Sequence, residues 1–170
     1  MALRKIIYLP DVRLRQRNLP VTDFGPTLQT LIDDMFETMY EAKGVGLAAP
    51  QIGINLQLAV IDVDNDREKP FVLINPQIID MHGSIECLEG CLSIPSAYET
   101  LARAETTTVS ALDRLGKTFQ ISGDGLLSEC LQHEIEHLQG KLFIDKLSTL
   151  KQNLVRKKLE KYKRTHSRSS

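Results

Sequence analysis

Apolar residues recur at helical spacing in three stretches of the chain. Between residues 27 and 43 acidic residues lie mostly on other faces, which predicts an amphipathic helix that Gly44 ends in a left-handed conformation. A second helix is expected from Gly125 to Gly140, and its small purely polar surface predicts that it is buried. A third should follow Ser148, which can cap it. Its narrow apolar stripe comprises Leu150, Leu154, Val155, Leu159 and Tyr162.

Four shorter stretches have the Val, Ile and Leu content of strands. Residues 56–63 and 71–79 are joined by a polar loop, and residues 106–112 and 117–122 predict a hairpin. Residues 1–26 contain three prolines and no long periodic stretch, so we expect extended, irregular chain there. We expect the last six residues to be disordered.

Composition and charge indicate one globular domain. A chain of 170 residues, 42% apolar and 25% charged, can bury most of its surface on folding. It has neither a membrane-spanning apolar run nor a signal peptide, and its three cysteines are an odd number, so we expect a reducing cytosol. The net charge of −1 conceals a basic end, because residues 151–168 hold eight Lys or Arg against Glu160 alone.

A metal-binding pattern lies in the second helix, at residues 132–138 (QHEIEHL). His133 and His137 are four residues apart, so on a helix they leave one face and can close on one divalent ion. Glu134 would flank the metal, where it can take a proton from a metal-bound water, which indicates metal-assisted hydrolysis. The alternative is a surface helix with two unpaired histidines, which the apolar faces of this helix disfavour.

Two histidines leave a metal under-coordinated, and the best third ligand lies in residues 89–93 (EGCLS). A thiolate from Cys91 would complete three ligands and leave a fourth position open, as in a catalytic site. By chemistry alone Cys87 and Cys130 compete for this role, although Cys130, close to His133 on one helix, is better placed to line a pocket. The alternative for Cys91 is a buried free cysteine.

A third stretch, residues 44–51 (GVGLAAPQ), combines small residues with a terminal amide. Its two glycines and two alanines allow another chain to approach the backbone closely, and Gln51 offers a donor and an acceptor. Taken alone, this stretch predicts only a tight loop between helix and strand. A phosphate-binding loop is disfavoured, because no Gly-Lys-Ser/Thr follows.

Together, in their order and approximate spacing, these three stretches resemble the peptide deformylase family. Residues 10–11, 14–15 and 20–21 look like family positions too, so the resemblance covers nearly the whole chain. It implies an α+β fold in which antiparallel β-sheets surround a central helix that carries His-Glu-x-x-His. It also implies a bacterial, cytoplasmic enzyme with one catalytic domain, 1–147, and a basic C-terminal helix and tail, 148–170. The implied reaction removes the formyl group from the N-terminal methionine of new proteins and releases formate.

The resemblance also assigns roles by position. The implied metal is natively Fe²⁺, which Zn²⁺, Ni²⁺ or Co²⁺ can replace, and its ligands are Cys91, His133 and His137. Glu134 becomes the general base and acid as water on the metal attacks the formyl carbon. The oxyanion would lie against the metal, the Gln51 side-chain amide and the Leu92 backbone N–H. An extended substrate would contact Gly44, Val45, Gly46, Glu89, Gly90, Leu126, Glu129, Cys130 and His133.

Three glutamates near the expected site have predicted roles or differ from the usual family pattern. Glu89 is expected to pair with Arg103 and so brace the Cys91 loop. Glu136 stands where the family usually has Asp, and Glu129 occupies a position usually apolar at the pocket. We hypothesise that Glu129 narrows or polarises the methionine pocket; the alternative is a carboxylate turned to solvent.

Two other functions would explain part of this sequence pattern. A zinc endopeptidase shares His-Glu-x-x-His, but its third ligand is usually a downstream His or Glu, whereas here His166 lies in the tail and the best third ligand is Cys91, far upstream. A metal-stabilised ribosome-binding module would not need Glu134 and Gln51. The basic C-terminal helix suggests docking on ribosomal RNA near the emerging chain, or else a solvated helix. We expect a monomer, with no membrane contact and no sequence-specific nucleic-acid binding.

Overall fold

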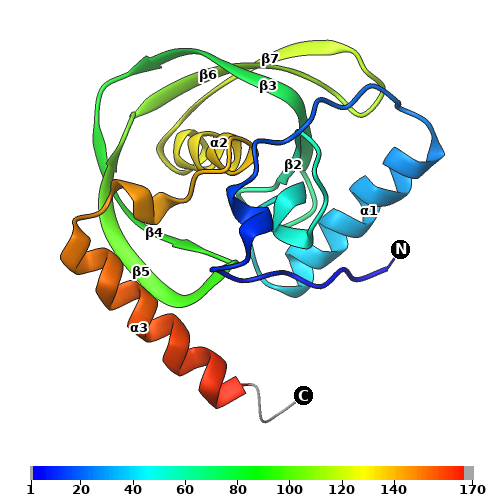
Figure 1. Cartoon of the computed structure of the whole chain (residues 1–170). Coiled ribbons are helices and arrows are strands. Elements are labelled where there is room, and N and C mark those ends of the chain that lie inside the picture. The colour runs from blue at the N-terminus through cyan, green and yellow to red at the C-terminus, as the bar shows by residue number, and fades with distance from the viewer. Residues whose placement is uncertain (1, 167–170) are drawn as a thin grey trace.

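Two antiparallel sheets wrap around one central helix in the computed structural model, which describes residues 2–166. Helix α2 lies in the middle of Figure 1, with α1 on one side and α3 against the outside of β5. The helices are α1 (Pro26–Glu41), α2 (Gly125–Leu138) and α3 (Thr149–His166), with short 3-10 helices at Val12–Arg15, Ala49–Ile52 and Phe143–Lys146. The strands are β1 (Gly46–Ala48), β2 (Leu58–Ile61), β3 (Phe71–His82), β4 (Ile85–Cys91), β5 (Ile94–Arg103), β6 (Thr106–Leu112) and β7 (Thr118–Asp124).

The larger sheet has the order β1-β2-β3-β6-β7, and β4 and β5 form the smaller one. Every adjacent pair is antiparallel, and the β6–β7 hairpin matches the expected one within two residues at each end. Apolar side chains of α2, including Leu131, Ile135 and Leu138, fill the space between the helix and the larger sheet. The α+β fold with a central helix is therefore confirmed. Within residues 2–166 no helix combines the length and apolarity that crossing a bilayer requires.

The end of α1 corrects one expectation. Lys43, not Gly44, takes the left-handed conformation, with φ +58°. The Lys43 N–H donates to the carbonyl of Tyr40 at 3.0 Å and the Gly44 N–H to that of Met39 at 2.9 Å. These two hydrogen bonds form a Schellman motif, in which the left-handed residue here is Lys43, one residue before the glycine. Gly44 is small for another reason, because a Cβ there would lie 2.7 Å from Leu92 Cδ1.

Helix α3 extends further than expected, and less of its apolar stripe is buried. Thr165 and His166 belong to it, which contradicts the expected disorder at these two positions; residues 167–170 lie outside the described part. Of the expected stripe, Val155 and Leu159 are buried against the β4–β5 side of the molecule. Leu150 and Leu154 are 70% and 44% exposed, because α3 touches the domain along one narrow edge.

Strands β4 and β5 have no counterpart among the strands expected from apolar content, and their pattern explains why. In β4 Cys87 and Glu89 are buried, whereas Leu88 between them is 70% exposed. In β5 the buried positions include Arg103. Charged residues thus occupy some of the buried positions, where a typical strand has apolar residues. The alternation of apolar and polar residues that would indicate a strand is therefore missing from the sequence.

Candidate metal centre

Helix α2 presents His133, Glu134 and His137 to the interior. Its N-cap is Asp124, and its Gln139 cap is followed by Gly140 with φ +76°, so the helix runs almost as expected. The i, i+4 spacing places His133 and His137 one above the other, with their Nε2 atoms 3.1 Å apart. Both imidazoles are buried. The predicted chelate geometry is therefore present.

Cys91 completes the group from the end of β4. The chain reverses between Cys91 and Ile94, which pair across the start of the β4–β5 hairpin, and this turn faces α2. The Cys91 Sγ lies 3.4 Å from His137 Nε2. One ligand atom from each of Cys91, His133 and His137 lies within 4.8 Å of the other two. All three cysteines are free, and Cys130 lines the cavity, as expected.

These three donors fit a divalent transition metal. Donor atoms bound tetrahedrally at about 2.0–2.3 Å stand about 3.3–3.8 Å apart, which the Cys91–His137 distance matches and the His133–His137 distance approaches. Two imidazoles and one thiolate leave a coordination position open, as in catalytic sites. Buried Glu134 Oε1 and His137 Nδ1 have no hydrogen-bond partner. An unpaired carboxylate oxygen beside three converging ligands is what a bound water would satisfy.

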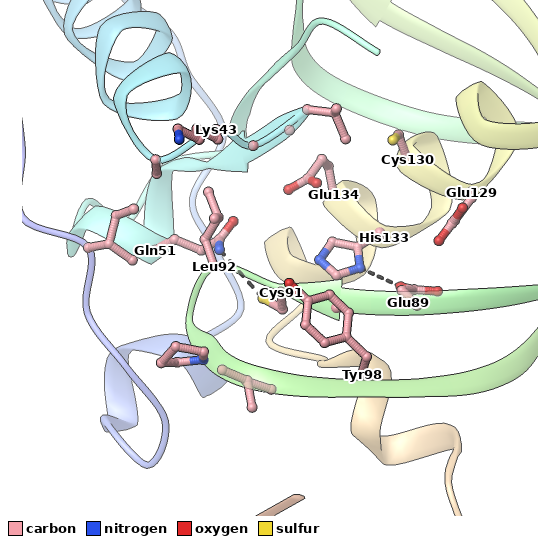
Figure 2. A pocket seen from close by; sticks show the side chains of 18 of the residues that line it. Lys43, Gln51, Glu89, Cys91, Leu92, Tyr98, Glu129, Cys130, His133 and Glu134 are labelled. Carbon is pink, nitrogen blue, oxygen red and sulfur yellow. Dashed lines mark hydrogen bonds and ion pairs between the residues drawn. The ribbon is translucent and has the colours of Figure 1, made fainter. Parts of the chain in front are cut away.

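A buried ion-pair network supports the ligands. Glu89 accepts two hydrogen bonds from Arg103, at 2.9 and 2.6 Å, and Glu136 accepts one from Arg103 at 2.8 Å. Glu89 also contacts His133 Nδ1 (Figure 2). The predicted Glu89–Arg103 pair is confirmed, and Glu136 reaches Arg103 despite its extra methylene. Although burial opposes it, His133 and Arg103 lower the pKa of Glu89. The Glu89 carboxylate therefore fixes the ring of His133 with Nε2 toward the other ligands.

Replacing Arg103 by Met should destabilise the protein by about 3–5 kcal/mol, because it leaves two carboxylates without their cation. Arg103 and Glu89 side chains are 1% and 3% exposed. The measurement is urea unfolding of metal-free protein. Arg15→Met is the matched control, since the Arg15–Asp145 pair is 37% and 40% exposed and should contribute at most about 1 kcal/mol. If both variants lost the same free energy of unfolding, the buried ion-pair network would not stabilise the protein more than the exposed pair does.

Glu134 lies at the floor of the site, against the backbone of β1. A Cβ at Gly46 would collide with the Glu134 carboxylate, so this glycine is required by close approach. Burial, with a contribution from Glu89, raises the pKa of Glu134 to about 7. A carboxyl with a raised pKa can both accept and return a proton near neutral pH.

Gln51 and Leu92 flank Cys91 in Figure 2. Gln51 is buried, and its Oε1 accepts from the Ala48 N–H at 2.9 Å, which fixes the amide. Its Nε2 then points to Cys91 Sγ at 3.6 Å and Ser93 Oγ at 3.1 Å. The structure thus brings this amide donor to Cys91, the expected metal ligand, which lies forty residues away in the sequence.

A cavity of about 520 Å³ opens above these groups. All the expected substrate residues line it, namely Gly44, Val45, Gly46, Glu89, Gly90, Leu126, Glu129, Cys130 and His133. Glu129 is half-buried and faces the same cavity, where burial and Glu89 raise the pKa of its carboxyl. The Glu129 carboxyl lies within hydrogen-bonding reach of the thiol of buried Cys87.

Several lining residues were not singled out as site residues from the sequence. They are Ile6, Tyr8, Ala42, Lys43, Leu88, Ile94, Pro95, Ser96, Tyr98 and Tyr162. Most come from the N-terminal segment, β5 and α3, whose approach to α2 depends on the tertiary fold. Ser96, with φ +67°, is a local irregularity of β5, but no sequence signal marked it.

Comparisons with known proteins agree with this geometry. The model of the polypeptide deformylase family matches residues 3–153. Peptide deformylase 1 of Shewanella oneidensis is 52% identical over 161 residues, covering 95% of this chain and 96% of that protein. A crystal structure of a peptide deformylase from Legionella pneumophila is 59% identical, with a TM-score of 0.97 over 98% of this chain and 99% of that one.

A more distant structure has the same fold. The peptide deformylase from Ehrlichia chaffeensis is 35% identical and superimposes with a TM-score of 0.92, covering 96% of this chain and 98% of that one. The family model and the Shewanella and Legionella proteins each match this chain over nearly its whole length. The chain therefore belongs to the polypeptide deformylase family, metal-dependent hydrolases that remove the N-formyl group from newly made proteins.

Proposed function

We propose that Glu134 is the general base and acid of deformylation in this chain, and that Cys91, His133 and His137 hold the metal. The observation that carries this proposal is the unpaired, buried Glu134 Oε1 beside three converging ligand atoms. A bound divalent ion would polarise the formyl carbonyl and make water a stronger acid. Fe²⁺ is our proposal for the native ion, with Zn²⁺, Ni²⁺ or Co²⁺ as substitutes.

The residues of the chain would handle protons and charge in turn. Glu134 accepts a proton from the attacking water and delivers it to the departing amine. The Gln51 Nε2–H and the Leu92 backbone N–H donate to the oxygen that becomes negative as the formyl carbon turns tetrahedral. Gln51 suits this task because Ala48 already holds its carbonyl oxygen, so the donor needs no reorientation.

The substrate would lie extended along β1. This strand is at the edge of its sheet, so one row of its backbone groups has no partner strand. Gly44, Val45 and Gly46 line the cavity on this edge, and Gly90 lines its opposite side. A formylated peptide can therefore add as a further strand, with its methionine side chain directed toward Leu126 and Cys130.

Formate release tests this proposal directly. The substrate is N-formyl-Met-Ala-Ser, and the protein is loaded anaerobically with Fe²⁺. Rapid release of formate supports the assignment, whereas internal cleavage of unformylated peptides would favour an endopeptidase. A folded, iron-loaded protein that releases no formate would contradict the proposed roles.

Replacing Glu129 by Ile should raise the preference for methionine over the shorter, branched leucine as first residue by about three- to tenfold. We propose that the half-buried Glu129 carboxyl makes this wall of the pocket polar, whereas an apolar wall gains about 0.8 kcal/mol per buried CH₂. Specificity constants for formyl-Met, formyl-norleucyl and formyl-Leu peptides measure the effect. Glu129→Gln, which keeps size and polarity, is the control, and an unchanged Glu129→Ile preference would contradict the idea.

We propose that the enzyme works as a monomer in the cytoplasm, with residues 1–147 as its catalytic domain and 148–170 as an appended helix that docks on the ribosome. Exposed cations on α3 support docking; among them are Arg156, Lys157, Lys158 and Lys161. Changing the three lysines to Gln should weaken co-sedimentation with ribosomes and flatten its salt dependence. Unchanged sedimentation would contradict docking, and formate release provides the control for folding.

A further inference from the structure

The loop at residues 62–67, which follows β2, is bonded to the chain just before β1 on the edge of the cavity. The Asp62 N–H donates to the Val45 carbonyl at 2.9 Å. The Asn65 Nδ2–H donates to the Gly44 carbonyl at 2.5 Å. One loop thus fixes two consecutive carbonyl groups of the segment on which the substrate is proposed to lie. No sequence signal marked Asn65 as part of the site.

Peptide geometry converts these two bonds into a direction for the neighbouring N–H groups. In a planar trans peptide the C=O and the following N–H point in opposite directions. Because the loop continues β2, a carbonyl that faces the loop leaves the next N–H facing the free edge of β1. The Val45 and Gly46 N–H groups therefore point to the side where a further strand can add. Within residues 2–166 the Val45 N–H has no hydrogen-bond partner.

The loop that carries Asn65 is itself anchored to α1 through the buried carboxylate of Asp62. The Asp62 Oδ2 accepts from the Tyr40 hydroxyl at 2.5 Å and from the Arg67 N–H at 2.9 Å. The Arg67 guanidinium lies 4.2 Å from the centre of the Tyr40 ring and pairs with Glu37 at 2.8 Å. Burial and the bond to Asp62 raise the pKa of Tyr40, so its hydroxyl remains a donor. The side chain of Asn65 is therefore presented from a fixed loop.

The backbone at Asn65 restricts which residues can take its place. Its φ of +53° is left-handed, a conformation that asparagine, aspartate and glycine adopt more readily than other residues. The Asn65 N–H donates to the Asp62 carbonyl at 3.1 Å, which closes a tight turn. Asparagine thus adopts the turn and also donates from its amide, whereas an ionised aspartate of the same shape has no donor.

We infer that Asn65 is a positioning residue for deformylation: by holding the Gly44 carbonyl, it aims the Val45 N–H at a backbone carbonyl of the bound peptide. The inference rests on the proposed binding of the substrate along β1. Asn65 acts through Gly44, which lines the cavity. Without the amide, the peptide group between Gly44 and Val45 can rotate, so its N–H is aligned for only part of the time. The peptide then binds more weakly, whereas the metal ligands and Glu134 keep their places.

The test measures KM and kcat for formyl-Met-Ala-Ser with the iron-loaded wild type, Asn65→Asp and Asn65→Gly. Both substitutions suit the left-handed backbone and remove the amide donor. KM should rise about three- to tenfold in each variant, the range that one hydrogen bond supplies, while kcat stays within about twofold. The comparison compound is N-formyl-3-(methylthio)propylamine, which keeps the methionine side chain but has no backbone carbonyl. Its inhibition constant against the peptide should stay the same.

Lys69→Gln is the matched control, because this exposed residue of the same polar loop gives the same change of net charge as Asn65→Asp. A KM that stays at the wild-type value in both Asn65 variants, or that rises as much in Lys69→Gln, would overturn the inference. Equal weakening of N-formyl-3-(methylthio)propylamine would also overturn it, because the whole cavity would then be distorted. Formate release by the wild type tests the proposed function separately.

Discussion

Glu134→Gln should lower kcat for formate release by about 10²–10⁴-fold, the range typical of a lost general base. Glutamine has nearly the shape of the buried carboxyl but cannot accept a proton from water. The Gly46 backbone leaves room for either side chain. The wild-type rate should fall as pH is lowered, because a base acts in its deprotonated form and burial raises the pKa of Glu134.

Metal content separates this effect from a general loss of the site. The Glu134→Gln protein should bind one equivalent of Co²⁺ with the visible spectrum of the wild type, because Glu134 is not among the three converging ligands. Formate release and the cobalt spectrum are measured on the same preparation. A rate within about tenfold of wild type would contradict the general-base role.

Cys91→Ala should lower metal affinity at least about 100-fold and abolish formate release at stoichiometric metal. Changes to groups that only support ligands cost about 10–100-fold, and removing a ligand should cost more. The loss should also remove the sulfur-to-metal charge-transfer band of the Co²⁺ protein. Affinity should fall in acid for the wild type, since burial opposes but Glu134, Cys91 and Glu89 raise the pKa of metal-free His133, whose proton a metal must displace.

Cys130→Ala is the control for the loss of a thiol near the site. Cys130 lines the same cavity, but burial raises the pKa of its thiol, so it stays protonated. This variant should keep one equivalent of metal and the charge-transfer band. If Cys130→Ala lost metal and Cys91→Ala retained it, the ligand assignment would be wrong.

Local sequence patterns predicted the elements in which the pattern of apolar and polar residues itself shows which positions are buried. Helix α1 and the β6–β7 hairpin match expectation within a few residues, because each has one apolar face. The loop at 64–70 was predicted from its polar residues, and it lies between β2 and β3 as expected. The cap at Lys43 was misplaced by one residue, since a Schellman motif depends on hydrogen bonds to Tyr40 and Met39 that composition does not reveal. The β4 strand was missed because Glu89 is buried there by a partner fourteen residues away.

The sequence by itself determined the chemistry of this protein. His133, Glu134 and His137 belong to one helical turn, so their spacing alone predicts a chelate and a nearby base, and Gln51 and Cys91 stand in motifs that resemble one family. Only the tertiary structure decided which cysteine meets the histidines, how Arg103 joins Glu89 to Glu136, and that Tyr8 and Tyr162 meet beside the site. Local periodicity fixes which side chains share a face of one element, whereas contacts between distant segments depend on how the whole core packs.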